Sequence, residues 1–293
     1  MQAPRADATL PTLAPHGERT VAHVPVLDVA ARTDVGKVRE RNEDQFVVAH
    51  RGRWLAVDHT SIGDPRELTT PQGTLLVVAD GMGGQGGQGG GDVASAVAMD
   101  SFVEHSLLDM PWLSSGSVEG DALLARDVNR FLVACQAHLR AIAARKHLPP
   151  RLGTTLTAAY VQGSRLTVVH VGDTRAYSFR QGVLHRLTHD HTLGAEIARA
   201  AGSPSSGGAL SHVLVNAIGG NSDAPHAEIA SFDLQSGDRL LLCSDGLHGT
   251  IDDARIAEIL GNASDARAAV DALITAVLAL GAPDNVTAVV AFG

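Results

Sequence analysis

Apolar and polar positions alternate along the chain in blocks that predict strands and helices. The most informative block is the apolar run at 75–79, which stops at Asp80 inside a glycine cluster. Five apolar residues in succession are typical of a strand that is buried on both faces. Asp80 would stand at the end of this strand, and the glycines beside it leave room for a cation or a hydrogen-bond donor. For this stretch alone, an Asp-Gly turn is the simpler interpretation.

The same pattern recurs at three other places in the chain. Acids adjoin apolar runs at Asn42-Glu43-Asp44 before 46–49, at Ser244-Asp245-Gly246 after 239–243, and at Asp284-Asn285 before 286–290. Oxygen ligands of this kind suit hard cations such as Mg²⁺ or Mn²⁺, whereas a zinc site would normally recruit His or Cys at regular spacings. The sequence shows no such spacing, so we expect a site built from carboxylates.

The remaining pattern predicts a mixture of strands and helices. The expected elements are a strand from Val26, a strand through His50 with a hairpin partner at 53–57, a surface loop at 58–73, helices at 92–108 and 119–147, an antiparallel meander at 153–161, 165–171, 175–179 and 183–187, a short helix near 192–201, a strand at 238–243, helices at 253–261 and 265–280, and a strand at 286–292. Runs of strands interrupted by helices favour antiparallel sheets with helices layered outside them. No linker between two cores is visible, so we expect one domain at 25–293 after a flexible leader at 1–24.

Composition narrows the class of protein. Of the 293 residues, 44% are hydrophobic and only 3% aromatic, which predicts a large aliphatic core. The net charge of −9 argues against a nucleic-acid partner held by phosphate contacts. Cys135 and Cys243 both lie in apolar segments, which favours a reducing compartment such as the cytoplasm over a disulfide framework. No stretch approaches the roughly 20 apolar residues that span a bilayer.

Seven short motifs follow one another along the chain. They are Arg39-Glu40-Arg41-Asn42-Glu43-Asp44, Val78-Ala79-Asp80-Gly81-Met82-Gly83-Gly84, Gly153-Thr154-Thr155, His170-Val171-Gly172-Asp173-Thr174-Arg175-Ala176-Tyr177, Leu187-Thr188-His189-Asp190-His191, Ser244-Asp245-Gly246-Leu247 and Asp284-Asn285-Val286-Thr287. In this order they resemble the motifs of the metal-dependent protein phosphatases, the type 2C serine/threonine phosphatases, and in particular their bacterial branch. The resemblance covers about residues 27–293, and seven motifs in one order are far more specific than any one of them.

The resemblance implies an α+β fold. Its architecture would be a four-layer α-β-β-α sandwich, in which helix pairs flank two antiparallel sheets and a two-metal centre lies at one end. By position in the motifs, Asp80 resembles the carboxylate that bridges both metals, and Gly81 would add its backbone carbonyl. Asp245 and Asp284 would complete the coordination of one metal, and Glu43 would complete that of the other. The implied cofactors are two Mn²⁺ or Mg²⁺ ions.

Three further residues are implied around these ligands. Asp44 is similar to a partner that orients metal-bound water, and Asn285 to a neighbour of the ligands. Asp173 resembles the family's ligand for a third, weaker metal, shared with Asp245. Without the resemblance, Asp173 would be interpreted as a hairpin turn residue. Segment 85–91 is longer and richer in glycine than the family's, which leaves the geometry beside Asp80 open.

The implied reaction is direct attack on phosphoserine or phosphothreonine by a hydroxide that bridges the two metals. Arg39 resembles the phosphate-binding arginine, whose fork can hold two phosphoryl oxygens where a lysine could not. Arg41 is the alternative, although the spacing from Glu43 favours Arg39. Met82 stands where some eukaryotic members have a histidine proposed as general acid, so metal-bound water would protonate the leaving oxygen.

The expected function is therefore a metal-dependent serine/threonine protein phosphatase that opposes a bacterial serine/threonine protein kinase. Its expected partners are phosphorylated proteins, among them that kinase and its targets, and we expect a monomer. A segment around 188–225 would form a flap that influences substrate choice, with His189 and His191 as surface or hinge residues rather than metal ligands. Two alternatives stay open: a silent phosphoprotein-binding module, against which the intact acids count, and an enzyme acting on small phosphate esters or an anti-sigma-factor antagonist.

Overall fold

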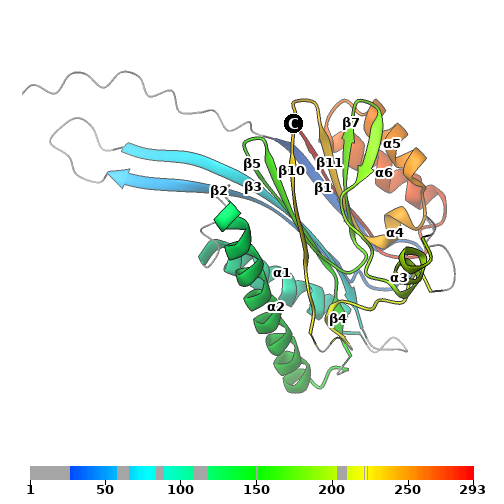
Figure 1. Ribbon diagram of the computed structural model, residues 1–293. Helices are drawn as coiled ribbons and strands as arrows, with labels where there is room; N and C mark the ends of the chain where they lie inside the picture. The colour runs from blue at the N-terminus through cyan, green and yellow to red at the C-terminus, as the bar shows by residue number, and fades with distance from the viewer. Residues whose placement is uncertain are drawn as a thin grey trace, which may run out of the picture.

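Two antiparallel sheets packed face to face form the centre of the molecule (Figure 1). The computed structural model describes residues 27–57, 66–83, 89–108, 118–149, 151–202, 210–220, 222 and 224–293. Helices α1 (Gly91–Leu108) and α2 (Val118–Lys146) cover one sheet, and α5 (Asp253–Asn262) and α6 (Ala266–Ala279) cover the other. The α+β, four-layer architecture implied by the motifs is confirmed, whereas the predicted leader at 1–24 lies outside the described residues.

Every strand pairing within the two sheets is antiparallel. The smaller sheet has the order β1 (Asp28–Asp34), β12 (Val286–Phe292), β11 (Arg239–Cys243), β7 (Arg175–Arg180) and β8 (Val183–Arg186). The larger has the order β10 (Glu228–Asp233), β6 (Arg165–Val171), β5 (Leu156–Gln162), β3 (Arg66–Met82), β4 (Gly153–Thr154) and β9 (Ile218–Gly219), with β2 (Asp44–Val57) paired to β3.

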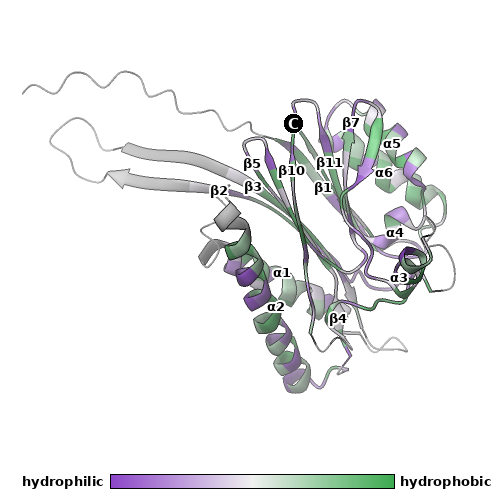
Figure 2. Ribbon diagram, in the orientation of Figure 1, coloured by the Kyte–Doolittle hydropathy of each residue, from purple (hydrophilic) through white to green (hydrophobic). Residues whose placement is uncertain are grey.

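Strand β3 is buried on both faces where it crosses the sandwich. Leu76 and Val78 point into the core between the two sheets, together with Leu242 and Val289 of the smaller sheet. The alternate residues of β3 pack under α1 and α2. Figure 2 shows hydrophobic residues concentrated on these central strands. The strand is thus held on both sides, and Asp80, near its end at Met82, is fixed relative to both sheets.

Helix boundaries follow local signals in the sequence. Asp252 accepts a hydrogen bond from the backbone nitrogen of Arg255 and begins α5, and Asp265 does the same for Ala268 at the start of α6. The two shorter helices are α3 (Leu193–Ala200) and α4 (Asp245–His248), and α4 begins with the acidic residue Asp245. The predicted helices are confirmed, with α4 added.

The strand that follows Asp44 is longer than predicted. It runs unbroken as β2, and the predicted turn near Gly52 is a register shift between Arg51 and Gly52. A β-bulge of this kind absorbs one extra residue without ending a strand. Residues 66–73 of the predicted surface loop belong to β3, while 58–65 lie outside the described residues. The β2–β3 hairpin extends beyond the other strands (Figure 1).

The predicted meander is interrupted between β6 and β7. These two strands lie in different sheets, so residues 172–174 cross from one sheet to the other. A hairpin turn at Asp173 is therefore wrong. Strand β10, which pairs with β6 at the edge of the larger sheet, was not predicted, because its half-exposed residues lack a clear apolar alternation.

Candidate metal centre

The acidic residues singled out in the sequence come together at one end of the sandwich. Asp44 begins β2 and stands directly opposite Asp80 of β3. Asp245 opens α4 at the end of β11, and Asp284 precedes β12, which pairs with β11. The two sheets thus bring their acids to a shared edge, because β3 of one sheet and β11 of the other end there and β12 begins there.

Burial places a high electrostatic cost on this cluster. It raises the pKa of Asp80 well above its usual value, and the negative charge of Asp44 raises it further. Burial likewise raises the pKa of Asp245, and the charge of Asp284 is the next contributor. A hydrogen bond with the carboxyl of Asp80 acts in the opposite direction and lowers this pKa. Four carboxyl groups that repel one another in a desolvated place are stabilised when cations neutralise them.

Asp44 is held from one side only. Its Oδ2 accepts hydrogen bonds of 2.7 Å from the hydroxyls of Ser244 and Thr287. Its Oδ1 is buried and has no hydrogen-bond partner among the described residues. Burial raises the pKa of Asp44 to about 7, against the opposing effect of the two hydroxyls. An oriented carboxylate with one unpartnered buried oxygen fits a neighbour of a hydrated cation.

Glu43 and Gly81 converge at the start of α1. The Glu43 carboxylate accepts a 3.2 Å hydrogen bond from the backbone nitrogen of Gly91. A Cβ atom on Gly91 would lie 2.6 Å from both Glu43 Oε2 and the Gly81 carbonyl oxygen. A side chain on Gly81 would overlap the carbonyl of Gly91. Both glycines are required here, because a Cβ on Gly91 would fill the space between the two oxygens and a Cβ on Gly81 would collide with backbone carbonyls.

Asn285 fixes the backbone that carries Glu43. Its Oδ1 accepts from the Glu43 nitrogen at 2.8 Å, and its Nδ2 donates to the carbonyls of Val35 and Arg41 at 3.0 and 2.8 Å. These three hydrogen bonds are all directed at the loop before β2. Asn285 therefore aligns Glu43 with the acids of the other sheet.

Arg39 lies at the same edge and pairs with a cluster acid. Its Nη2 donates to Asp284 Oδ2 at 2.7 Å, and its side chain is 55% exposed. The hydrogen bond to Asp284 raises the pKa of Arg39, with smaller contributions from Glu43 and Asp245. The exposed guanidinium is thus a cation beside the cluster that an anionic group from solvent can reach.

Asp173 lies in the crossover between the sheets, on the side of Asp245. Burial raises the pKa of Asp173 to about 8, and Asp245 is the next largest cause. Its backbone carbonyl accepts a 2.9 Å hydrogen bond from Nε2 of His248 in α4. The histidine, whose pKa burial lowers to about 3, stays neutral and ties the crossover to the helix that Asp245 begins.

The donor set fits two hard divalent cations. It consists of the carboxylates of Glu43, Asp80, Asp245 and Asp284 and the peptide carbonyl of Gly81, which are oxygen donors of the kind that such cations prefer. The ligand types predicted from the strand ends are therefore brought together by the fold, with Asp44 and Asn285 beside them.

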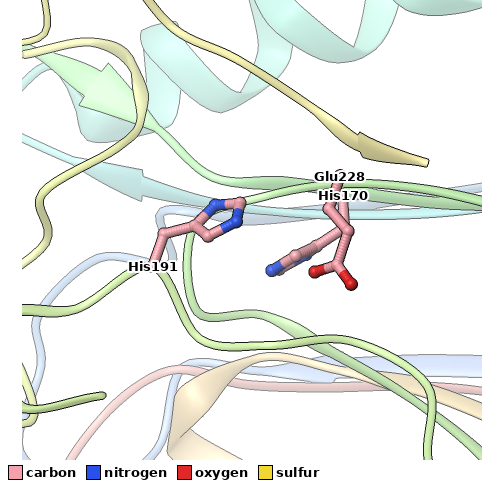
Figure 3. A group of neighbouring side chains, drawn as sticks. All are labelled: His170, His191 and Glu228. Carbon is pink, nitrogen blue, oxygen red and sulfur yellow. The ribbon is translucent and has the colours of Figure 1, made fainter. Parts of the chain in front are cut away.

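A second group of metal-ligand side chains was not predicted. His170 of β6 stands opposite Glu228 of β10, and His191 lies beside them (Figure 3). One ligand atom from each of the three lies within 4.8 Å of the others, the one such group found in the described part of the chain. His170 and Glu228 are 58 positions apart, so only the unpredicted pairing of β6 with β10 could have revealed the group.

Comparison with known proteins gives consistent matches. The family model described as Protein phosphatase 2C matches residues 66–287. The chain is 34% identical over 273 residues to "Serine/threonine protein phosphatase PstP" of Mycobacterium tuberculosis, covering 91% of this chain and 45% of that protein. It is 30% identical over 266 residues to "Serine/threonine phosphatase stp" of Listeria innocua, covering 87% of this chain and 92% of that protein.

Solved structures agree with these sequence matches. The catalytic domain of serine threonine protein phosphatase PstP, solved in complex with two manganese ions, superposes with a TM-score of 0.67 at 30% identity and covers 91% of this chain and 97% of that one. The chain spans slightly less than half of the full PstP sequence it matches. Among the described helices, none combines the length and apolar character needed to cross a membrane.

Proposed function

The chain belongs to the protein phosphatase 2C family, and from this premise we propose that it is a metal-dependent serine/threonine protein phosphatase. The observation that carries the proposal is the convergence of Asp80, Asp245 and Asp284 from two sheets on one partly buried place. Members of this family use two metal ions, and a related catalytic domain binds two manganese ions.

We assign the ligands by their positions around the cluster. Glu43 and the Gly81 carbonyl would hold one cation, Asp245 and Asp284 the other, and Asp80 would contact both. Bound there, two Mn²⁺ or Mg²⁺ ions would supply an activated water and neutralise phosphoryl oxygens. Asp173 would hold a third, weaker ion together with Asp245. Asp44 would orient water through its unpartnered Oδ1.

Arg39 would bind the phosphoryl group of the substrate. Its guanidinium is exposed and contacts Asp284, one of the proposed ligands. Its planar fork can donate two parallel hydrogen bonds to a phosphate. The substrate would thus be oriented before the bond to phosphorus breaks, and Arg39 would stabilise charge that develops on the phosphoryl oxygens.

The proposed partners follow from this chemistry. Substrates would be proteins phosphorylated on serine or threonine, and the enzyme would oppose a bacterial serine/threonine kinase as a monomer. Residues 25–293 would act as one catalytic domain with a flap around 188–225. Both cysteines, Cys135 and Cys243, are buried free thiols, which supports a reducing compartment such as the cytoplasm.

Hydrolysis of a phosphothreonine peptide tests this proposal. The purified protein is assayed with Mn²⁺, with Mg²⁺ and with chelator, beside p-nitrophenyl phosphate as a small ester. We expect metal-dependent phosphate release, with the peptide preferred in kcat/KM. Peptide binding without hydrolysis in either metal would favour the silent binding module, and a preference for the small ester would favour an enzyme with small substrates.

A further inference from the structure

His248 ties the crossover between the two sheets to the short helix α4. Its ring Nε2 lies 2.9 Å from the backbone carbonyl of Asp173. Because a carbonyl can only accept a hydrogen bond, Nε2 carries the proton and donates it. The neighbouring carbonyl, that of Gly172, accepts instead from the backbone nitrogen of His191 at 2.7 Å. The peptide group that follows the Asp173 side chain is thus held by a side chain of α4.

The imidazole and the Asp245 carboxyl lie on one face of this helix. Asp245 is the first residue of α4 and His248 is the last, three positions later. Side chains three positions apart lie on the same side of a helical turn. The backbone nitrogen of Gly249 donates to the Asp245 carbonyl at 2.7 Å and closes the turn. A single turn therefore presents the carboxyl and the imidazole to the crossover together, and it sets where Asp173 lies relative to Asp245.

Helix α4 is itself held firmly in place. Leu247 is fully buried and belongs to the core that α5 and α6 cover. A Cβ atom on Gly246 would overlap the backbone carbonyl of Asn285, so the helix packs directly against the loop that carries Asp284. His248 thus holds the crossover from a helix that has little freedom to follow it if the contact is lost.

The cation that lies closest in sequence to Asp173 is engaged elsewhere. Arg175 donates from Nε and Nη2 to the two carboxylate oxygens of Asp190, at 2.9 and 2.7 Å. Its Nη1 donates to the hydroxyl of Tyr177 at 2.9 Å. A bidentate pair of this kind occupies the guanidinium fork and compensates its charge. The neutral imidazole of His248 therefore holds Asp173 without adding a positive charge that would compete with a metal ion.

We propose that His248 is a positioning residue that sets Asp173 beside Asp245, an inference that rests on the proposed function. These two carboxylates are the ones assigned above to the third, weaker ion. Without the imidazole donor, the Asp173 carbonyl loses its partner and the crossover moves away from α4 more readily. The ligands proposed for the other two ions all lie outside the crossover. Loss of His248 therefore weakens the third ion and leaves the other two in place.

Two substitutions of His248 test this role. His248→Leu removes the donor, while His248→Gln places an amide nitrogen near the position of Nε2. Electron paramagnetic resonance of unbound Mn²⁺ counts the bound ions and gives their dissociation constants without an activity assay. We expect two tight ions and one weaker ion in the wild type. His248→Leu should weaken the third ion about tenfold, as loss of one hydrogen bond predicts, and His248→Gln should restore most of its affinity.

Asp173→Asn is the matched control, because it removes the proposed ligand itself. It should weaken the third ion as well, and adding His248→Leu to it should cause little further loss, since both substitutions act through one carboxylate. A purely structural role would weaken all three ions alike in His248→Leu. That result overturns the inference, and so does a third ion that binds His248→Leu as tightly as wild type.

The remaining outcomes separate this inference from the proposed function. A wild type that binds only two Mn²⁺ ions and hydrolyses a phosphothreonine peptide overturns the role of His248 alone. A wild type that hydrolyses no phosphopeptide overturns the proposed function, whereas the Mn²⁺ counts decide the role of His248 by themselves. Nitrogen-15 NMR adds a spectroscopic readout: we expect the proton of His248 on Nε2. A proton on Nδ1 alone overturns the inference.

Discussion

Asp44 and Asp80 stand opposite each other on neighbouring antiparallel strands, β2 and β3. Burial raises the pKa of both carboxyl groups, and the negative charge of Asp44 raises that of Asp80 further. Paired charges of the same sign destabilise the fold unless cations lie between or beside them. The register of β2 and β3 therefore places two carboxyl groups where a bound divalent metal would stabilise the fold.

Replacing Asp80 should stabilise the metal-free protein. We expect chelator-treated Asp80→Asn to exceed chelator-treated wild type in free energy of unfolding, since burial and the neighbouring carboxylates disfavour the charged form of Asp80 and raise its pKa. The wild type should gain stability on addition of Mn²⁺, and the variant should gain little. Urea unfolding at pH 7.5 measures both differences. The exposed Asp233→Asn serves as control, and a variant no more stable than wild type in chelator would contradict the account.

Asp44 should matter for activity more than for folding. In Asp44→Asn the amide oxygen can still accept from Ser244 and Thr287, so the fold is retained. The buried Oδ1, however, is replaced by an NH₂ group that cannot accept a hydrogen bond. Loss of a partner that orients a metal ligand or metal-bound water typically lowers activity or metal affinity about 10–100-fold. We expect a fall in kcat of that order with an unchanged circular dichroism spectrum, and wild-type kcat would show that the free oxygen has no role.

Arg39 should contribute to substrate binding and not to metal binding. Arg39→Ala removes a charged donor, so we expect KM for a phosphopeptide to rise about 10–100-fold. Mn²⁺ affinity should be no weaker, because Arg39 competes with a cation for Asp284 Oδ2. Arg39→Lys should not restore KM, since an ammonium lacks the planar fork. Arg41→Ala is the matched control, and if it alone raised KM, the phosphate would be bound by the other arginine.

Acid should destabilise the protein through His170. This residue is fully buried, and burial lowers its pKa to about 4. Between that value and its usual 6.5, the unfolded chain binds the proton and the folded one does not, so stability is present above pH 6.5 and is lost as the pH falls. The contribution is about 3 kcal/mol. His170→Gln should reduce the loss between pH 6.5 and 4, whereas the exposed His185→Gln should not. Equal pH dependence in all three proteins would exclude this role.

The sequence predicted the acidic cluster well because its members stand at the ends of apolar runs. Asp80, Asp245 and Asp284 each adjoin a strand of the core, so knowing the strands is enough to find the candidates. Their convergence also needed the order of strands in two sheets, which the family resemblance implied and the local pattern did not. The hydroxyls of Ser244 and Thr287 lay inside recognised motifs, yet only the structure shows them both bound to Asp44.

Long-range pairing explains what the sequence could not predict. Gly52 and Pro71 are turn-forming residues by local rules, but β2 and β3 pair through both positions. Gly172-Asp173 has the composition of a hairpin turn, although it crosses between sheets. The contact of His170 with Glu228 depends on edge strand β10, whose half-exposed residues give no clear pattern. In each case tertiary packing overrides a correct local preference.

The location of bound Mn²⁺ tests the central claim most directly. Crystals grown with Mn²⁺ would be measured on both sides of the manganese absorption edge, so that anomalous scattering marks the ions. We predict two strong peaks, one among Glu43, Asp80 and the Gly81 carbonyl, and one among Asp80, Asp245 and Asp284. Manganese bound instead between His170, His191 and Glu228, with none beside Asp80, would contradict the assignment of the metal centre.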